Sequence, residues 1–269
     1  MVFVSQRHKS YNSLDVKGVQ GYKQLFKEIY KFKPDVVIGT SPPLPINIAC
    51  YFAARLRGAR FVLDVKDPAI YLGEELGSLK KGSFKHRLYV FLERFLHRHA
   101  DKLLVSTEAD FEEIGQKFSV PEHKLVWCRN GVSKAFIEVA EKTRVPVKEL
   151  EILYSGTMGN YELPQFIEEV YSKLKVKPRL HLILNFDGSK GNIQEREKIY
   201  AMLKKHGLCK IDNVTVEFSI PYEELPKHYP SNAIAVLPLP NFFKTTIPAK
   251  IYDYAACELP IVAKARLME

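Results

Sequence analysis

The sequence lacks the signatures of several common structural and catalytic classes. Its four cysteines are far apart and include no C-x-x-C pair, so neither a disulfide framework nor a cysteine-ligated zinc site is indicated. No apolar run approaches the roughly 18 to 20 residues that cross a bilayer. The P-loop, nucleophile-elbow and H-E-x-x-H motifs are also missing, which argues against the corresponding NTPase, hydrolase and metalloprotease chemistry. These absences leave a globular protein of another class.

The charge of the chain favours anionic partners. Its formal net charge is +9 and its pI is near 9.2, which fits nucleic acid, an acidic membrane surface or phosphorylated small molecules. The aromatic residues are not interleaved with basic residues on a strand or loop that would stack bases, so nucleic-acid binding is not expected. A short apolar run precedes Arg7, His8 and Lys9, the reverse of a signal peptide's charge order, and we therefore expect a cytoplasmic protein that starts with a strand.

Short apolar segments alternate with longer helical patterns, which is typical of parallel sheets buried on both faces. In the first half we expect strands at 35–39, 60–65, 102–106 and 124–128, and helices at 19–31, 44–56 and 85–99. In the second half we expect strands at 151–155, 179–185, 214–218, 233–237 and 260–263, and helices at 163–174, 192–206, 222–229 and 249–257. The charged, weakly patterned stretch 133–149 suits a connector. The sequence therefore predicts an α/β protein of two Rossmann-like domains, at 1–133 and 134–269.

The loops that follow the strands are the candidate ligand sites, because ligands of open α/β folds lie at the carboxyl ends of the strands. Gly156 and Thr157 follow the strand at 151–155, where glycine lets backbone N–H groups approach a phosphate. Asp187 and Gly188 follow the strand at 179–185. An ordinary strand-to-helix turn explains the loop at Gly156 equally well.

A second candidate site lies at a helix start late in the chain. Pro248 fits the first helical position, where its missing N–H costs nothing. Lys250 then lies in the first turn, where a cation opposes the helix dipole, so an anionic ligand explains it better than structural convenience does. Asp253 lies one turn further along the same face, and a plain surface ion pair between Lys250 and Asp253 is the alternative. The residues that lead into this helix are candidates too: Thr245, Thr246 and Ile247.

Asp67 is the candidate catalytic residue. It follows the apolar strand at 60–65, at the mouth of the expected cleft. A carboxylate there can bind ligand hydroxyls or act on a proton. It can equally cap the next helix or pair with Lys66.

The stretch 80–102 is basic and amphipathic. It holds seven Lys or Arg residues against Glu93 and Asp101, and five apolar residues recur at helical spacing. Such a helix can lie on an anionic bilayer surface. Alternatively, its apolar stripe simply packs on the core of the domain.

Five stretches, in order and with matching spacing, resemble the retaining GT-B glycosyltransferases called glycosyl transferases group 1 (family four), and particularly the polysaccharide-biosynthesis branch. They are 33–43 (KPDVVIGTSPP), 61–67 (FVLDVKD), 92–101 (LERFLHRHAD), 130–132 (NGV) and 248–263 (PAKIYDYAA and LPIVA). The resemblance implies transfer of a sugar from a nucleotide-diphosphate donor, a UDP- or GDP-sugar, to a hydroxyl of a glycan or lipid-linked acceptor. It places the acceptor on the N-terminal domain and the donor on the C-terminal domain, with no metal or other cofactor.

The resemblance also implies roles for individual residues. Asp253 matches the carboxylate that binds the ribose of the donor, where the family usually has Glu. Thr245 stands where many members have a carboxylate for the donor sugar, and Thr157 stands where many have an Arg for the diphosphate. Lys250 is then the candidate for compensating the phosphate charge.

Both ends depart from the family pattern, so we expect a chain shortened at both ends. Such a chain could be a non-catalytic protein that binds a nucleotide sugar or a partner chain, and an epimerase of similar fold is a third possibility. Missing strands would leave an open sheet edge, which favours a homo-oligomer.

Overall fold

The computed structural model describes residues 3–5, 13–15, 18–67, 69–75, 77–143, 149–157, 171–185, 193–205, 214–238 and 247–264. The chain divides into two compact units, Met1–Arg129 and Asn130–Glu269. The division falls four residues before the expected boundary between 133 and 134. Within the described ranges, no helix is long and apolar enough to cross a membrane.

The first unit is built on a four-stranded parallel sheet in the order β3-β4-β5-β6. These strands are β3 (Val36–Ser41), β4 (Arg60–Val65), β5 (Lys102–Val105) and β6 (Leu125–Trp127). The helices of this unit are α1 (Gly18–Phe32), α2 (Leu44–Arg57), α3 (Ala69–Glu75), α4 (Phe84–His99), α5 (Glu108–Phe118) and the 3-10 helix η1 (Glu122–Lys124). Two short strands, β1 (Phe3–Ser5) and β2 (Ser13–Asp15), form a separate parallel pair.

The sheet of the first unit buries one face more completely than the other. Alternate residues such as Phe61, Leu63 and Leu103 are buried in a core that includes residues of α2, α4 and α5. Their neighbours on β3, Val36 and Ile38, are exposed. The expectation of a sheet buried on both faces is therefore wrong for this edge strand, because a continuous apolar run does not reveal which face a helix covers.

The second unit is a five-stranded parallel sheet in the order β11-β10-β7-β8-β9. Its strands are β7 (Glu151–Thr157), β8 (Arg179–Asn185), β9 (Val214–Phe218), β10 (Ala233–Pro238) and β11 (Ile261–Lys264). Its helices are α6 (Lys134–Lys142), α8 (Ile193–Lys205), α9 (Lys250–Ala256) and the 3-10 helices η2 (Tyr171–Lys173) and η4 (Tyr222–His228).

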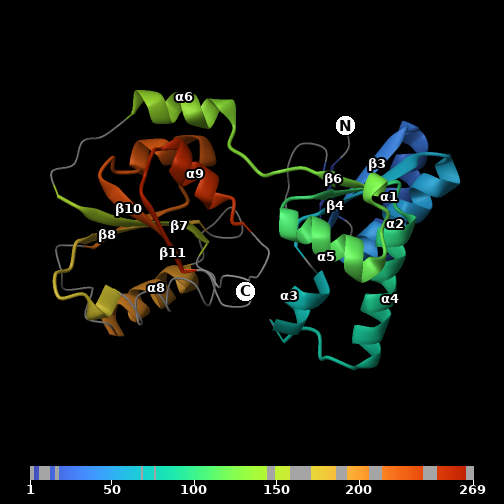
Figure 1. Cartoon of the computed structure of the whole chain (residues 1–269), viewed down its shortest axis with the longest axis horizontal. Coiled ribbons are helices and arrows are strands. Elements are labelled where there is room, and N and C mark those ends of the chain that lie inside the picture. The colour runs from blue at the N-terminus through green and yellow to red at the C-terminus, as the bar shows by residue number, and fades with distance from the viewer. Residues whose placement is uncertain are drawn as a thin grey trace. The chain divides into compact units, whose positions relative to one another are not determined.

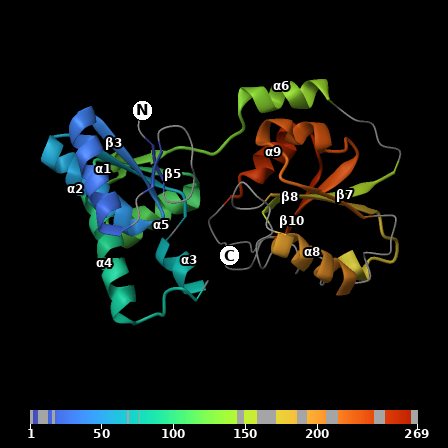
Figure 2. The ribbon, with the colours of Figure 1, turned by 180° about the vertical axis from the view of Figure 1, so that it is seen from behind.

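Helices cover both faces of this second sheet. In Figure 1 and Figure 2, α6 and α9 lie on one face and α8 on the other. Leu153 and Ile183 pack on the α9 side, while Leu182 packs on the α8 side against Ile199. The expected burial on both faces is confirmed here. In this sheet β7 is the middle strand, and its carboxyl end lies beside α9.

Two expected elements differ from the structure. The stretch expected to be a connector contains α6, whose N-terminus is capped by the Ser133 hydroxyl, which accepts a hydrogen bond from the Phe136 N–H at 3.2 Å. Phe136 and Ala140, four residues apart, bury one stripe of this helix. The helix expected at 222–229 is the 3-10 helix η4, which contains Pro226. Most of the helix expected at 163–174 lies outside the described residues.

Candidate functional site

The carboxyl end of β7 meets the start of α9 within the second unit. Gly156 has a φ of 155°, a backbone conformation that L-residues rarely adopt. A Cβ added there would lie only 3.0 Å from the Lys250 Nζ. The same Nζ lies 4.6 Å from the centre of the Tyr154 ring, within the range of a cation–π contact. The missing side chain of Gly156 thus makes room for a cation at the end of the strand.

Tyr254 fixes α9 to this strand. Its hydroxyl accepts a hydrogen bond from the Ser155 N–H at 2.8 Å and donates to the Ser155 carbonyl at 3.3 Å. The Tyr254 ring is fully buried in the core on the α9 side of the sheet. Because Tyr254 is four residues after Lys250 on the same short helix, this contact also sets the position of Lys250.

Asp253 is a buried carboxylate with a specific partner. The Tyr222 hydroxyl, from η4, donates a hydrogen bond to Asp253 Oδ1 at 2.8 Å. Burial raises the pKa of Asp253, and the hydrogen bond from Tyr222 opposes that rise. Burial also raises the pKa of Tyr222, with the hydrogen bond to Asp253 adding to the effect. Nothing in the sequence pattern singled out Tyr222 as a site residue.

The structure therefore brings Gly156 and Lys250 together and places Asp253 one turn from Lys250. Thr157 is the last residue of β7, and Ile247 and Pro248 precede α9. Four other predicted donor contacts lie outside the described residues: Asp187, Gly188, Thr245 and Thr246.

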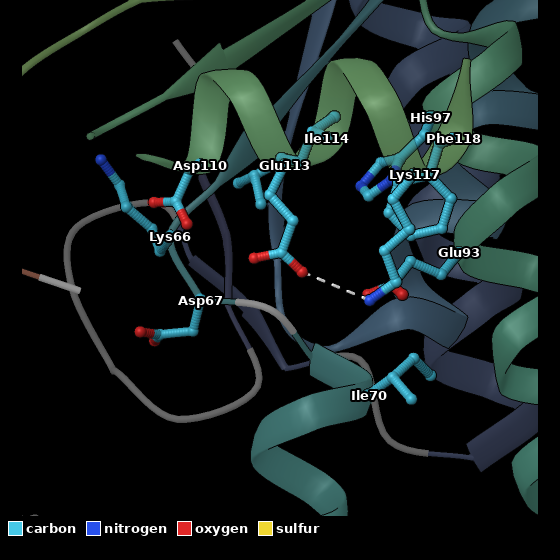
Figure 3. Close-up of a pocket in the computed structure, with 11 residues that line it drawn as sticks. Lys66, Asp67, Ile70, Glu93, His97, Asp110, Glu113, Ile114, Lys117 and Phe118 are labelled. Atoms are coloured by element: carbon cyan, nitrogen blue, oxygen red, sulfur yellow. Dashed lines mark hydrogen bonds and ion pairs between the residues drawn. The ribbon is translucent and has the colours of Figure 1, made fainter. Parts of the chain in front are cut away.

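The first unit has a pocket of its own beside the loop that follows β4 (Figure 3). Asp67, the candidate catalytic residue, lines it. Burial raises the pKa of the Asp67 carboxyl, nearby Asp110 raises it further, and Lys66 lowers it. Lys66 itself forms an ion pair with Asp64 at 3.3 Å. The remaining lining residues come from β4, α3, α4 and α5: Val65, Ile70, Glu93, His97, Glu113, Ile114, Lys117 and Phe118.

Asp110 is held in a fixed position at the start of α5. The Thr107 hydroxyl accepts a hydrogen bond from the Asp110 N–H at 3.0 Å and donates to Asp110 Oδ2 at 2.7 Å. Lys117, two turns further along α5, forms an ion pair with Glu113 at 3.4 Å, which Figure 3 shows as a dashed line. The wall that α5 contributes to the pocket is therefore charged.

Two buried titratable residues of α4 form the inner wall of the pocket. Burial raises the pKa of Glu93 to about 7, although the positive charge of Lys117 and hydrogen bonds from the backbone N–H groups of Ile70 and Ala69 oppose the rise. Burial lowers the pKa of His97 to about 3, so the imidazole is neutral at physiological pH. The His97 ring packs edge-on against Phe118, with ring centroids 4.4 Å apart, and among the residues that the structure describes its Nδ1 atom has no hydrogen-bond partner.

Sequence reasoning missed Glu93 and His97 as site residues. Their spacing of four residues on an amphipathic helix was a usable signal, since it places both on one face. In the parts of the chain that the structure describes, no group of three or more His, Cys, Asp or Glu side chains could hold a metal ion.

With this geometry in place, known proteins provide the family context. Residues 6–131 match the glycosyl transferase 4-like domain. WcaI of Escherichia coli (strain K12), a protein assigned as a glycosyl transferase of colanic acid biosynthesis, is 24% identical over 175 residues, which cover 61% of this chain and 43% of WcaI. This chain thus spans less than half the length of that relative.

Solved structures identify the fold. Sucrose-phosphate synthase of Thermosynechococcus elongatus superposes with a TM-score of 0.65 at 15% identity, over 91% of this chain and 60% of that one. Alr3699/HepE of Anabaena, in complex with UDP-glucose, gives 0.61 at 12% identity, over 90% and 62% of the two chains. The two parallel α/β units thus have the fold of the GT-B glycosyltransferases.

Proposed function

We propose that this protein transfers a sugar from a nucleotide-diphosphate sugar to a hydroxyl of a glycan or lipid-linked acceptor, in the synthesis of a surface polysaccharide or glycolipid. The observation that carries the proposal is the contact of Lys250 with the Gly156 end of β7. The match of the N-terminal unit to the glycosyl transferase 4-like domain supports it. The UDP-glucose bound by HepE supports a UDP-sugar as donor.

In this proposal Lys250 stabilises the diphosphate. As the bond to the sugar breaks, negative charge develops on the departing diphosphate, and a fixed ammonium group beside it lowers the barrier. The bare backbone at Gly156 lets a phosphate oxygen approach both the strand end and Lys250 Nζ. The other proposed donor contacts fall into two groups. Those at the ends of the strands β7 and β8, or just after them in the sequence, bind the phosphate and the sugar: Thr157, Asp187 and Gly188. Those that precede α9 in the sequence are Thr245, Thr246, Ile247 and Pro248.

Asp253 binds the ribose of the donor in the same proposal. A carboxylate accepts hydrogen bonds from two adjacent hydroxyls, and Tyr222 holds one of its oxygens in a fixed direction. Aspartate is one methylene shorter than the glutamate usual in the family, and in this proposal Tyr222 is a positioning residue that fixes the direction of the Asp253 carboxylate. No metal is needed, because Lys250 supplies the positive charge.

Asp67 is the proposed residue of the acceptor side. Its raised pKa and its position in a pocket with Asp110 suit a carboxyl group that binds or deprotonates an acceptor hydroxyl. Retention of the anomeric configuration is part of the proposal through the family resemblance alone.

A turnover assay tests this function. The protein is incubated with UDP-glucose, other UDP-sugars and GDP-sugars, with and without a membrane and glycan extract as acceptor, and released nucleotide is quantified. Transfer predicts release of the nucleoside diphosphate that increases with acceptor and falls by at least about tenfold in Asp67→Asn. Glu122→Gln, at an exposed position of the same unit, is the control.

The alternatives give different results in the same assay. A non-catalytic protein would bind the nucleotide sugar without releasing nucleoside diphosphate from it. An epimerase would convert one nucleotide sugar to another without acceptor. Either result contradicts the proposed transfer.

A further inference from the structure

The start of α3 is held by a carboxylate from another helix. Glu93 of α4 accepts hydrogen bonds from the backbone N–H groups of Ala69 and Ile70, the first two residues of α3. The residue is buried, with 6% of its surface exposed. N–H groups at a helix start have no partner within the helix, so a side chain that accepts from them decides where the helix begins. Glu93 therefore fixes the point at which the chain enters α3.

Asp67 lies two residues before this helix. The two structural roles that the sequence allows for Asp67 are filled by other residues. Glu93 accepts from the start of α3, and Lys66 forms an ion pair with Asp64 at 3.3 Å. Asp67 and Glu93 line the same pocket (Figure 3). The Asp67 carboxyl is thus left for a ligand, and its direction depends on where α3 starts.

Helix α3 is attached to α4 near its other end as well. Glu74 Oε1 of α3 lies 2.6 Å from His86 Nε2 of α4. This contact is seven residues after Asp67 in the sequence, whereas Glu93 holds the second and third residues after it. The Glu93 contact is therefore the one close enough to orient Asp67, and the Glu74 contact provides a comparison on the same pair of helices.

Packing alone does not explain a carboxylate at position 93. Burial raises the pKa of Glu93 to about 7, so ionisation of this group above that pH costs stability. A neutral side chain of the same size would avoid this cost, which indicates a role for the charge. The other charged or titratable groups that line the pocket are Lys66, Asp67, His97, Asp110, Glu113 and Lys117.

We propose that Glu93 is a positioning residue for the transfer reaction: by holding the Ala69 and Ile70 N–H groups, it sets the direction in which Asp67 meets the acceptor hydroxyl. The inference rests on the role proposed above for Asp67. An ionised carboxylate has two strong acceptor oxygens for the two N–H groups, whereas a protonated carboxyl or an amide has one. Asp67 is therefore best oriented when Glu93 is ionised.

The turnover assay, repeated across a range of pH, tests this role. In the parent protein kcat is expected to rise as the pH rises through about 7, the pKa of Glu93. Glu93→Gln is expected to lack this inflection and to have a kcat about tenfold lower than the parent at high pH, because a small misplacement of a catalytic group is costly. The KM for the nucleotide sugar is expected to be unchanged, since the proposed donor contacts belong to the second unit.

Stability separates positioning from a merely structural role. A structural residue loses stability and turnover together when it is replaced. Glu93→Gln removes the charge that burial penalises, so at high pH we expect a protein at least as stable as the parent but slower. The matched control is Glu74→Gln, which removes the charge from the other contact between α3 and α4 and is expected to keep both the rate and the inflection.

Nuclear magnetic resonance provides a readout that needs no turnover. The signals of the Ala69 and Ile70 amides and of the Asp67 carboxyl carbon are followed as the pH is varied. In the parent and in Glu74→Gln, all three are expected to shift with an inflection near pH 7, the pKa of Glu93. In Glu93→Gln this inflection is expected to disappear from all three.

The outcomes distinguish this inference from the proposed function. Absence of turnover by the parent with every nucleotide sugar would contradict the transfer, and the Asp67 signal would then decide alone whether Glu93 orients that residue. An active parent whose Glu93→Gln variant keeps both the rate and the inflection would overturn the positioning role and leave the transfer intact. An Asp67 signal that does not respond to Glu93 would overturn it as well.

Discussion

The Lys250 ammonium group lies over the ring of Tyr154 and only 3.0 Å from the point where a Cβ at Gly156 would be. The aromatic ring holds the cation on one side, and the bare backbone of Gly156 borders it on the other. Together these contacts place the ammonium group beside the end of a central strand, where parallel α/β sheets bind their ligands.

Filling the space at Gly156 is expected to disrupt this arrangement. In Gly156→Ala the new methyl group displaces Lys250 Nζ, and alanine is strained at a φ of 155°. We expect nucleotide binding to weaken by at least about tenfold and the free energy of unfolding to fall by about 1–3 kcal/mol. Gly131→Ala is the control, because a Cβ there meets nothing within 4 Å. Equal effects of the two substitutions on binding would show that the space at Gly156 has no special role.

Removing the Tyr222 hydroxyl is expected to weaken binding of the ribose of the nucleotide but not binding of its diphosphate. Tyr222→Phe keeps the ring contact with Phe136, at 5.0 Å between centroids, but leaves the buried Asp253 without its donor. The lost hydrogen bond costs about 1–3 kcal/mol of stability, measured by denaturant unfolding followed by circular dichroism. Affinity for UDP is expected to fall more than affinity for inorganic diphosphate, which has no ribose. An equal loss of affinity for UDP and for inorganic diphosphate would contradict the positioning role of Tyr222. Tyr30→Phe, at an exposed ring of the first unit, is the control for stability.

The buried Glu93 is expected to make the first unit less stable as the pH rises. Its pKa is raised from 4.5 to about 7 in the folded protein, so its contribution to stability is present below pH 4.5 and is lost as the pH rises through about 7. Glu93→Gln stays neutral and can still accept from the backbone N–H groups of α3. The stability of this variant relative to the parent is expected to rise by up to about 3 kcal/mol between pH 4.5 and pH 8.

Unfolding followed by tryptophan fluorescence measures this difference, since Trp127, the single tryptophan of the chain, lies on β6 of the same unit. Glu122→Gln, at an exposed carboxylate of η1, is the control. A difference between Glu93→Gln and the parent that does not change with pH would mean that Glu93 is ionised in the folded protein throughout.

The sequence predicted the helices and strands wherever the periodic pattern of apolar residues was long enough to be recognised. The strands containing Phe61 and Leu182 were predicted with the same bounds that the structure has, because short runs of Val, Ile and Leu between helical patterns are typical of buried parallel strands. Helix α5 was missed, although Thr107 and Asp110 carry a capping pattern at its start. Its apolar stripe is short and its first turn is acidic, so no helix was predicted there.

The sequence indicated individual residues of the candidate site, but not the contacts between them. Gly156, Lys250 and Asp253 each belonged to a recognisable motif, yet the contact between Lys250 and Gly156 joins segments 94 positions apart and depends on the order of the strands. Tyr222 and His97 escaped prediction for the same reason. Their roles arise from burial and from partners on other elements, which no local pattern encodes.

The most direct test of the proposed function is a calorimetric titration of the full chain with UDP and GDP, in the parent and in Lys250→Ala. We predict binding of at least one of the two nucleotides and a loss of about tenfold to hundredfold in affinity on removing the ammonium group, with Lys227→Ala, on the exposed side of η4, unchanged. Absence of binding by the folded parent protein, or equal affinity of the parent and Lys250→Ala, would contradict a donor site at the end of β7.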